Sequence, residues 1–172
     1  MEEASTPGFV ANIRTEIRTI LDTLKAANPN VVVFLARIIP LAFTNPEERR
    51  HWVAGVDAVN TSVSVVAAEA NAAATAPWVH VVDQNTGFDL STMMTGGGHP
   101  NAAGEAFMAA NWFTAMKWYL DGASAPQAEP PTDEVSIVAV GDIITQGGNG
   151  RPSYREPLAR LLAGEDVAGV NP

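Results

Sequence analysis

The sequence predicts an α/β protein built on a parallel sheet, and three observations lead to this class. Two short apolar runs, 31–36 and 78–82, alternate with long stretches in which apolar residues recur at helical spacing. A third run, 135–140, is β-branched, ends in a Gly-Asp turn and is typical of a buried parallel strand. Strands that alternate with helices favour a parallel sheet.

The bulk composition indicates a globular domain and excludes several kinds of partner. The 172 residues are 47% hydrophobic and 17% charged, which is too apolar for a disordered chain and enough for one core. A net charge of −9 argues against nucleic acid as a partner. No apolar stretch is long enough to span a bilayer, so no membrane is expected, and the polar start Met1-Glu2-Glu3 shows no signal peptide.

The first element is expected to be a helix that begins at Thr6-Pro7 and runs to about Ala27. Thr6 supplies a capping hydroxyl, and proline is favoured in the first turn. The apolar residues behind it form one stripe, which consists of Phe9, Val10, Ile13, Ile17, Ile20, Leu21 and Leu24. The strand at 31–36 follows, and because it is apolar throughout we expect it to be buried on both faces.

A long helix is expected from Pro46, because Glu47 and Glu48 would lie in its first turn, where the helix dipole favours acidic residues. Its apolar stripe consists of Trp52, Val56, Val59, Val63 and Val66. The strand at 78–82 comes next. Residues 83–98 are then expected to form a long irregular loop that ends in three glycines.

The next helix is expected from about Ala102 to Leu120. Its packed face would consist of Ala103, Phe107, Ala110, Thr114 and Trp118. Residues 123–134 are rich in Pro, Ala and acid and predict a semi-extended linker. After the strand at 135–140, a short helix is expected around Tyr154 to Leu162.

No cofactor is expected. The chain has no cysteine, so a disulfide framework and a thiolate metal site are both excluded. The glycine-rich loop 147–150 lacks the Lys-Ser/Thr of a phosphate cradle, which argues against a nucleotide. The three histidines, His51, His80 and His99, show no metal-binding spacing.

Two blocks carry signals of chemistry. The first is Gly141-Asp142-Ile143-Ile144-Thr145-Gln146-Gly147, with Ser153-Tyr154-Arg155 behind it, and the second is Gly98-His99-Pro100-Asn101, which leads into a helix. Together they resemble the SGNH (GDSL-type) hydrolase family, especially its carbohydrate esterases that remove acetyl groups from plant polysaccharides. The resemblance implies a three-layer flavodoxin-like sandwich with a parallel sheet, incomplete or permuted in this chain, and a secreted protein.

The catalytic residues that the resemblance implies are mostly replaced. The nucleophilic serine would lie at Ile143, the triad aspartate would lie at Gly96, and only His99 is kept. Ser-His-Asp chemistry needs a hydroxyl to attack, a base to accept its proton and a carboxylate to orient that base. We therefore expect an inactive protein, in which His99 is a structural remnant and Asp142 caps the turn after the strand.

Several residues stay open as replacements for the lost groups. Asp83 and Asp89 precede His99, and either could supply the carboxylate. Ser153 is expected to cap the following helix, with a relocated nucleophile as the alternative. Tyr154 and Arg155 are expected to pack and to pair.

The order of the blocks suggests a division of the chain. Residues 1–122 resemble the later part of an SGNH-like domain, 123–134 form the linker, and 135–172 resemble the opening of such a domain. Two strands that the family has in the middle of its fold are absent, as is its Gly-x-Asn-Asp block. The leading hypothesis is a structural subunit whose terminal strand completes the sheet of the next copy, which gives a homo-oligomer, a ring or a head-to-tail polymer.

Three alternatives remain. The first is an esterase that acts on acetylated carbohydrate with a substitute nucleophile. The second is a carbohydrate-binding module that stacks sugars on tryptophans, although each of them occupies a core-like position: Trp52, Trp78, Trp112 and Trp118. The third is a fragment of a longer tandem protein.

Overall fold

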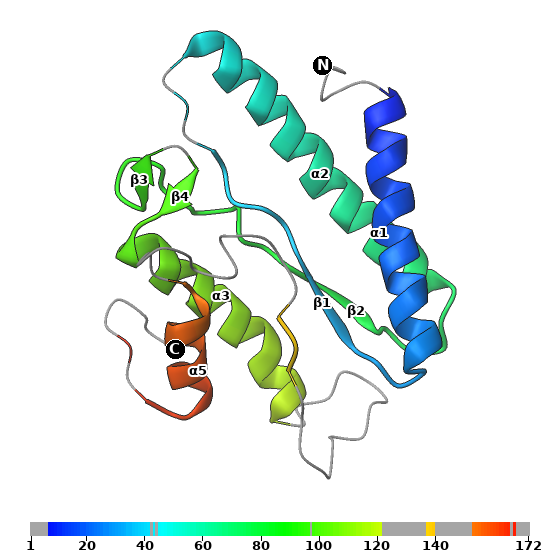
Figure 1. Ribbon diagram of the computed structural model, residues 1–172. Coiled ribbons are helices and arrows are strands. Elements are labelled where there is room, and N and C mark those ends of the chain that lie inside the picture. Colours follow the sequence, from blue (N-terminus) through cyan, green and yellow to red (C-terminus); the bar gives the residue numbers. More distant parts are fainter. Residues whose placement is uncertain are drawn as a thin grey trace. The chain divides into compact units, whose positions relative to one another are not determined.

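The computed structural model describes residues 7–41, 43, 45–96, 98–121, 137–139, 153–165 and 167. The chain divides into two compact units, Met1–Thr86 and Gly87–Pro172. This division falls elsewhere than the predicted linker, which lies outside the described residues. Helices and a small parallel sheet give the protein the α/β character that the sequence predicts (Figure 1).

The first unit contains α1 (Pro7–Ala27), β1 (Val33–Ala36), α2 (Pro46–Ala72) and β2 (Val79–Val82). The two strands are parallel, with Val33 opposite Val79 and Ala36 opposite Val82. In Figure 1, α1 and α2 lie side by side along the two strands. The core between them consists of Leu21, Val66, Ala67, Trp78 and Val79.

Two asparagines on α2 hold the strands in place. The Asn71 side chain accepts hydrogen bonds from the N–H groups of Trp78 (2.9 Å) and Val79 (3.0 Å) and donates one to the Val79 carbonyl (2.8 Å). Asn60 binds the backbone of Ile38 in the same way, accepting from its N–H at 2.7 Å and donating to its carbonyl at 3.1 Å. The two asparagines lie about three helical turns apart, so they share one face of α2. They fix where β2 begins and where the chain leaves β1.

The apolar stripe of α1 is only partly buried. Leu21 is 2% exposed, but Ile20 is 58% and Leu24 is 37% exposed. The prediction that the strand at 31–36 is buried on both faces is wrong as well, because every residue of it is only half-buried.

Trp52 does not lie in the core, which corrects the prediction for this residue. It is 45% exposed and stacks on Phe43 with the ring centroids 5.5 Å apart and the planes at 12°. The buried face of α2 is instead centred on Val56, Val63 and Val66, which are at most 5% exposed. Trp52 is on the same side of α2, but it lies in the second turn of the helix, before its buried residues begin at Gly55.

The second unit contains the hairpin of β3 (Met94–Gly96) and β4 (His99–Pro100), followed by α3 (Ala102–Leu120) and α5 (Arg155–Leu162). The helices predicted at 102–120 and around 154–162 are therefore confirmed. α3 packs against α5, as Figure 1 shows. At this contact Trp112 stacks on Tyr154 with centroids 5.9 Å apart and an interplanar angle of 16°. None of the described helices is both long and apolar enough to cross a membrane.

The β3–β4 hairpin corrects the prediction of an irregular loop over 83–98. Gly98, directly before β4, has a φ of 92°. Glycines are favoured in such hairpin connections because they adopt positive φ without steric cost. The strands are two and three residues long, which is too short for an alternating pattern to be recognised in the sequence.

The packed face of α3 also differs from the prediction, since Ala103 and Thr114 are exposed. Its buried residues are Gly104, Glu105, Ala106, Met108, Ala109 and Met116. Because this face contains a carboxylate and several small alanines, the periodicity of large apolar residues in the sequence does not identify it.

Residues 137–139 are the described part of the predicted strand 135–140. They lie in no strand, and Ile137 is 49% and Val138 is 80% exposed. The prediction of a buried strand is therefore wrong for these residues within a single chain. Residues 137–139 form no strand because a strand needs a hydrogen-bonded neighbour, and none of the described strands pairs with them. Asp142 and Ile143 lie outside the described residues.

Candidate functional site

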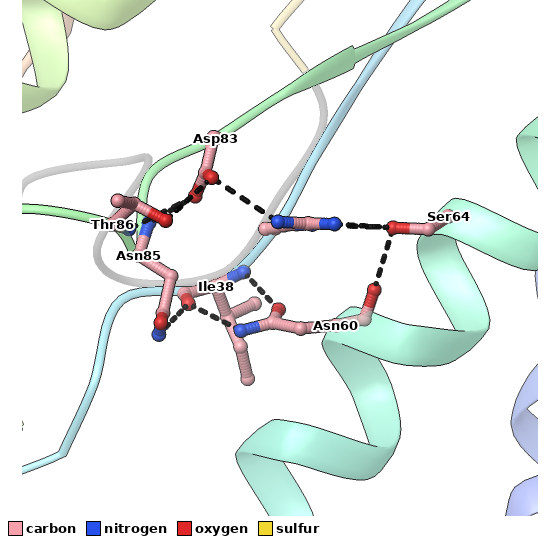
Figure 2. Close-up of polar contacts among 7 residues, drawn as sticks. Ile38, Asn60, Ser64, Asp83, Asn85 and Thr86 are labelled. Carbon is pink, nitrogen blue, oxygen red and sulfur yellow. Dashed lines mark hydrogen bonds and ion pairs between the residues drawn. The ribbon is translucent and has the colours of Figure 1, made fainter.

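Polar side chains gather where β1 and β2 end, the edge at which parallel sheets usually carry their sites. Arg37 directly follows β1, and Asp83 directly follows β2. The Arg37 guanidinium lies between two partners. Its Nη1 donates to Asp83 Oδ2 at 3.1 Å, and its Nε and Nη2 donate to Ser64 Oγ at 3.2 and 2.9 Å (Figure 2).

The Asp83 carboxylate is also held by the turn that follows it. Its Oδ1 accepts hydrogen bonds from the N–H groups of Asn85 (2.9 Å) and Thr86 (3.0 Å), and its Oδ2 accepts one from Thr86 Oγ1 (2.7 Å). Burial alone would raise the pKa of Asp83, but these hydrogen bonds and the Arg37 charge together lower it below its usual value. Asp83 is therefore ionised at neutral pH.

The side chains of this cluster bind one another and the backbone. The Ser64 hydroxyl accepts from Arg37 and donates to the Asn60 carbonyl at 3.1 Å. A guanidinium has no acceptor and cannot take a proton from serine. The side chains of Arg37 and Asp83 are 35% and 38% exposed, so their ion pair contributes at most about 1 kcal/mol. The cluster ties both strand ends to α2.

His99 lies in β4 directly opposite Gly96 of β3, the position at which the resemblance places the triad aspartate. The hairpin is closed by Thr95, whose hydroxyl donates to the His99 carbonyl at 3.0 Å. No ion pair among the described residues involves His99. The position at which the resemblance implies an aspartate therefore lies beside His99, and a glycine occupies it.

Asp89 is held in its own turn, which leaves it poorly suited to orient His99. Its Oδ1 accepts from Ser91 N–H (2.9 Å) and Ser91 Oγ (2.7 Å), and its Oδ2 accepts from Thr92 Oγ1 (2.9 Å). The Ser91 and Thr92 hydrogen bonds lower the pKa of this exposed carboxyl. Of the two candidates for the carboxylate that would orient His99, Asp83 binds Arg37, and Asp89 binds residues of its own turn.

The rest of the His99-Pro100-Asn101 block has a structural explanation. Asn101 caps α3, accepting from Ala103 N–H (2.9 Å) and Gly104 N–H (3.1 Å), and its Nδ2 donates to the Thr92 carbonyl (2.8 Å). A Cβ on Gly104 would lie 2.4 Å from the Met93 carbonyl oxygen. The block therefore joins the hairpin closely to the beginning of α3.

A buried acid in the second unit was not predicted. Glu105 is 3% exposed, and its carboxyl accepts a hydrogen bond from the Tyr154 N–H. Burial raises the pKa of Glu105 to about 7, although the hydrogen bond from Tyr154 opposes this shift. Glu105 lies three residues before the buried Met108 and four before the buried Ala109. This spacing, which places Glu105 on the same face of α3, was the signal in the sequence that it is buried.

Ser153 is buried just before α5, but it does not take the predicted capping position, because the N-cap of this helix is Tyr154 and carries no side-chain capping hydrogen bond. It is 4% exposed, and its Oγ accepts from Arg155 N–H at 3.3 Å and from Arg155 Nε at 3.4 Å. The hydroxyl faces an arginine, which is not a base. The alternative of a relocated nucleophile gains no support from these contacts.

Comparisons with known proteins do not place the chain in a family. No family model, no curated protein and no solved structure matches it at a significant level. The resemblance to SGNH hydrolases therefore rests on the two sequence blocks alone.

An aspartate introduced at position 96 is expected to form a hydrogen bond with His99. Directly opposed residues in an antiparallel pair have Cβ atoms about 5 Å apart, so the carboxylate of Gly96→Asp would lie within hydrogen-bond reach of the imidazole. We expect the ¹⁵N shifts of His99 to move to the pattern of a ring with its proton fixed on Nδ1. Gly96→Ala is the matched control, because it adds the Cβ without an acceptor. Equal spectra for the two variants would contradict the placement.

Proposed function

We propose that the protein is a degenerate SGNH-type domain that has lost ester hydrolysis and serves as a self-assembling structural subunit. Segment 135–140 of one chain adds to the parallel sheet of a neighbouring copy. Because the donated segment and the receiving sheet are different surfaces, the contact is heterologous and produces a ring or a head-to-tail polymer.

The loss of catalysis is supported by the chemistry of the replaced positions. The side chain of Ile143 has no oxygen with which to attack an ester, and Gly96 offers no carboxylate to His99. The hydroxyls of Ser64 and Ser153 both accept hydrogen bonds from arginines. These contacts give neither serine an activating base.

The single observation that carries the assembly proposal is the exposure of Ile137 and Val138, at 49% and 80%. Burial of such a side chain contributes about 1.5–3 kcal/mol, so leaving both in water is costly. β-branched residues favour extended pairing. An exposed segment of this kind adds readily to a sheet edge, where main-chain hydrogen bonds provide affinity and side-chain pockets provide specificity.

The three-layer sandwich is part of the same proposal. α1 and α2 lie together along β1 and β2 in the first unit, and α3 packs against α5 in the second. α3 follows the His99 block and α5 follows the Gly141 block, so segments from the two ends of the implied domain meet within one unit. A permuted domain, whose two ends belong to one chain, predicts such a meeting.

The assembly is expected to depend on the apolar side chains of the segment. Wild-type protein should show a mass of several chains or more by light scattering coupled to size exclusion, and rings or filaments by electron microscopy. Val138→Asp should shift this population strongly toward smaller species, because a charge cannot be buried in the receiving sheet. Leu90→Asp is the matched control, since Leu90 is also partly exposed, at 37%. A compact wild-type monomer at tens of micromolar would overturn the proposal.

The esterase hypothesis is tested on the same preparations. Hydrolysis of an acetylated carbohydrate that His99→Ala abolishes would show that the site still works, and the pseudoenzyme proposal would then fail. We expect no hydrolysis above the uncatalysed background.

A further inference from the structure

Helix α1 carries an apolar seam with the spacing of a coiled coil. Its members are Val10, Ile13, Ile17, Ile20 and Leu24, which follow one another at intervals of three, four, three and four residues. This repeat is the pattern by which one helix packs along another, with each side chain inserted between those of its partner. The seam extends over about four turns of the helix.

The first unit uses only one flank of this seam. Ile17 and Leu21 pack on the core, Arg18 pairs with Glu69 of α2, and the Lys25 ammonium lies 4.6 Å from the centre of the Trp78 ring. These contacts fix the rotation of α1 about its own axis. They turn the other flank, with Ile20 at 58% and Leu24 at 37% exposure, toward water.

Three threonines of α1 satisfy their hydroxyl groups within the helix. The hydroxyls of Thr15, Thr19 and Thr23 each donate to the carbonyl four residues earlier in α1, at 2.8, 2.8 and 2.7 Å. Each threonine thus satisfies its hydroxyl within the helix. Thr23 is the one of these that neighbours Ile20, three residues away, so a second helix can approach Ile20 without stripping this hydroxyl of its hydrogen bond.

The charge of α1 favours a copy of itself as the occupant. The whole chain carries −9, but α1 has three basic residues against two acidic ones. Two copies that approach through α1 therefore meet at a segment whose own net charge is small, although the chain as a whole is strongly acidic. Neither the sequence of α1 nor its exposed flank offers the basic cluster that an acidic partner would need.

The available area fits a weak dimer. A helix of 21 residues is about 31 Å long, and two such helices pack with their axes about 8–10 Å apart. A contact of this size lies at the lower end of specific interfaces, near about 1,000 Å² in total. An association in the micromolar range is the expected consequence.

We infer that two copies of the chain pair through an antiparallel α1–α1 contact made by the half-buried Ile13 and the exposed Ile20 and Leu24. The antiparallel direction sets the positive end of one helix dipole beside the negative end of the other. A two-fold axis near Ile20 then brings Ile13 of one copy close to the partner's Leu24. This isologous contact closes at two chains, so it is a different interface from the head-to-tail exchange proposed above.

The absence of cysteine from the sequence allows a direct test by cross-linking. Ile20→Cys places one thiol per chain next to the two-fold axis, and mild oxidation at micromolar concentration is expected to convert most of the protein into a disulfide-linked dimer. Asp22→Cys is the matched control, because this position lies on the far side of the helix from the seam. Equal cross-linking of the two variants would overturn the inference.

A second variant separates this contact from the head-to-tail exchange. In a Val138→Asp background, in which the exchange is blocked, sedimentation should still show a dimer, and adding Ile20→Glu should convert it to a monomer. The melting curve should be nearly unchanged, since Ile20 is mostly exposed. A monomer already in the Val138→Asp background would refute the α1 contact. A polymer that is insensitive to Val138→Asp would refute only the exchange.

Discussion

Replacing Glu105 with Gln is expected to stabilise the protein by about 3 kcal/mol above pH 7 and to have little effect near pH 4. The carboxyl is 3% exposed, and its burial raises its pKa from an ordinary 4.5 to about 7. The folded protein therefore holds a proton that the unfolded chain releases. The stability that depends on this proton is complete below pH 4.5 and is lost progressively as the pH rises to about 7.

The size of the effect follows from linkage, since one pH unit of difference between folded and unfolded pKa is worth about 1.4 kcal/mol. Gln has no proton to lose, and its carbonyl oxygen can still accept the Tyr154 N–H. Urea unfolding of both proteins between pH 4 and pH 8 measures the difference. Glu156→Gln on the exposed side of α5 is the control. A difference in unfolding free energy that does not change with pH would contradict the role of Glu105.

Leu21→Ala is expected to destabilise the first unit by about 2–5 kcal/mol. Leu21 is 2% exposed and packs against Val66, Ala67 and Trp78, where α1 meets α2 and β2. Truncation removes buried methyl groups and leaves a cavity that the packed helices cannot fully close. The melting temperature and the urea midpoint should both fall clearly.

The neighbouring Ile20→Ala is the matched control. It removes the same kind of side chain from the same helix turn, but Ile20 is 58% exposed, so a change within about 0.5 kcal/mol is expected for the isolated chain. Measurement at low protein concentration keeps the monomer as the reference. Similar losses for Leu21→Ala and Ile20→Ala would mean that α1 is rotated differently from the structure.

The helices could be predicted from the sequence because their signals are local. The helix expected from about Ala102 to Leu120 is found at those residues, and the first helix ends at Ala27 as expected. The packed faces were harder to predict. An apolar stripe indicates which side of a helix is hydrophobic, but the elements packed against the helix determine how much of that side is buried. Ile20 and Trp52 remain exposed to water.

The polar contacts of the candidate site could not be predicted, because each depends on tertiary neighbours. Nothing local in the sequence pairs Arg37 with Asp83, 46 residues away. Asn60 within a helix was a missed hint, since asparagine is a poor helix former and needs a reason to be there. Glu105 was hidden by the rule that charged residues lie outside.

The pair of asparagines on α2 also limits how the chain can change in length. Asn60 and Asn71 reach the backbones of Ile38 and Val79 only because whole turns separate them. One inserted or deleted residue between them would swing one amide by about 100° around the helix. That amide would lose its hydrogen bonds to the backbone, while the other asparagine would keep its hydrogen bonds. The number of residues between Asn60 and Asn71 must therefore correspond to whole helical turns. This spacing is more constrained than the identity of the residues between the two asparagines.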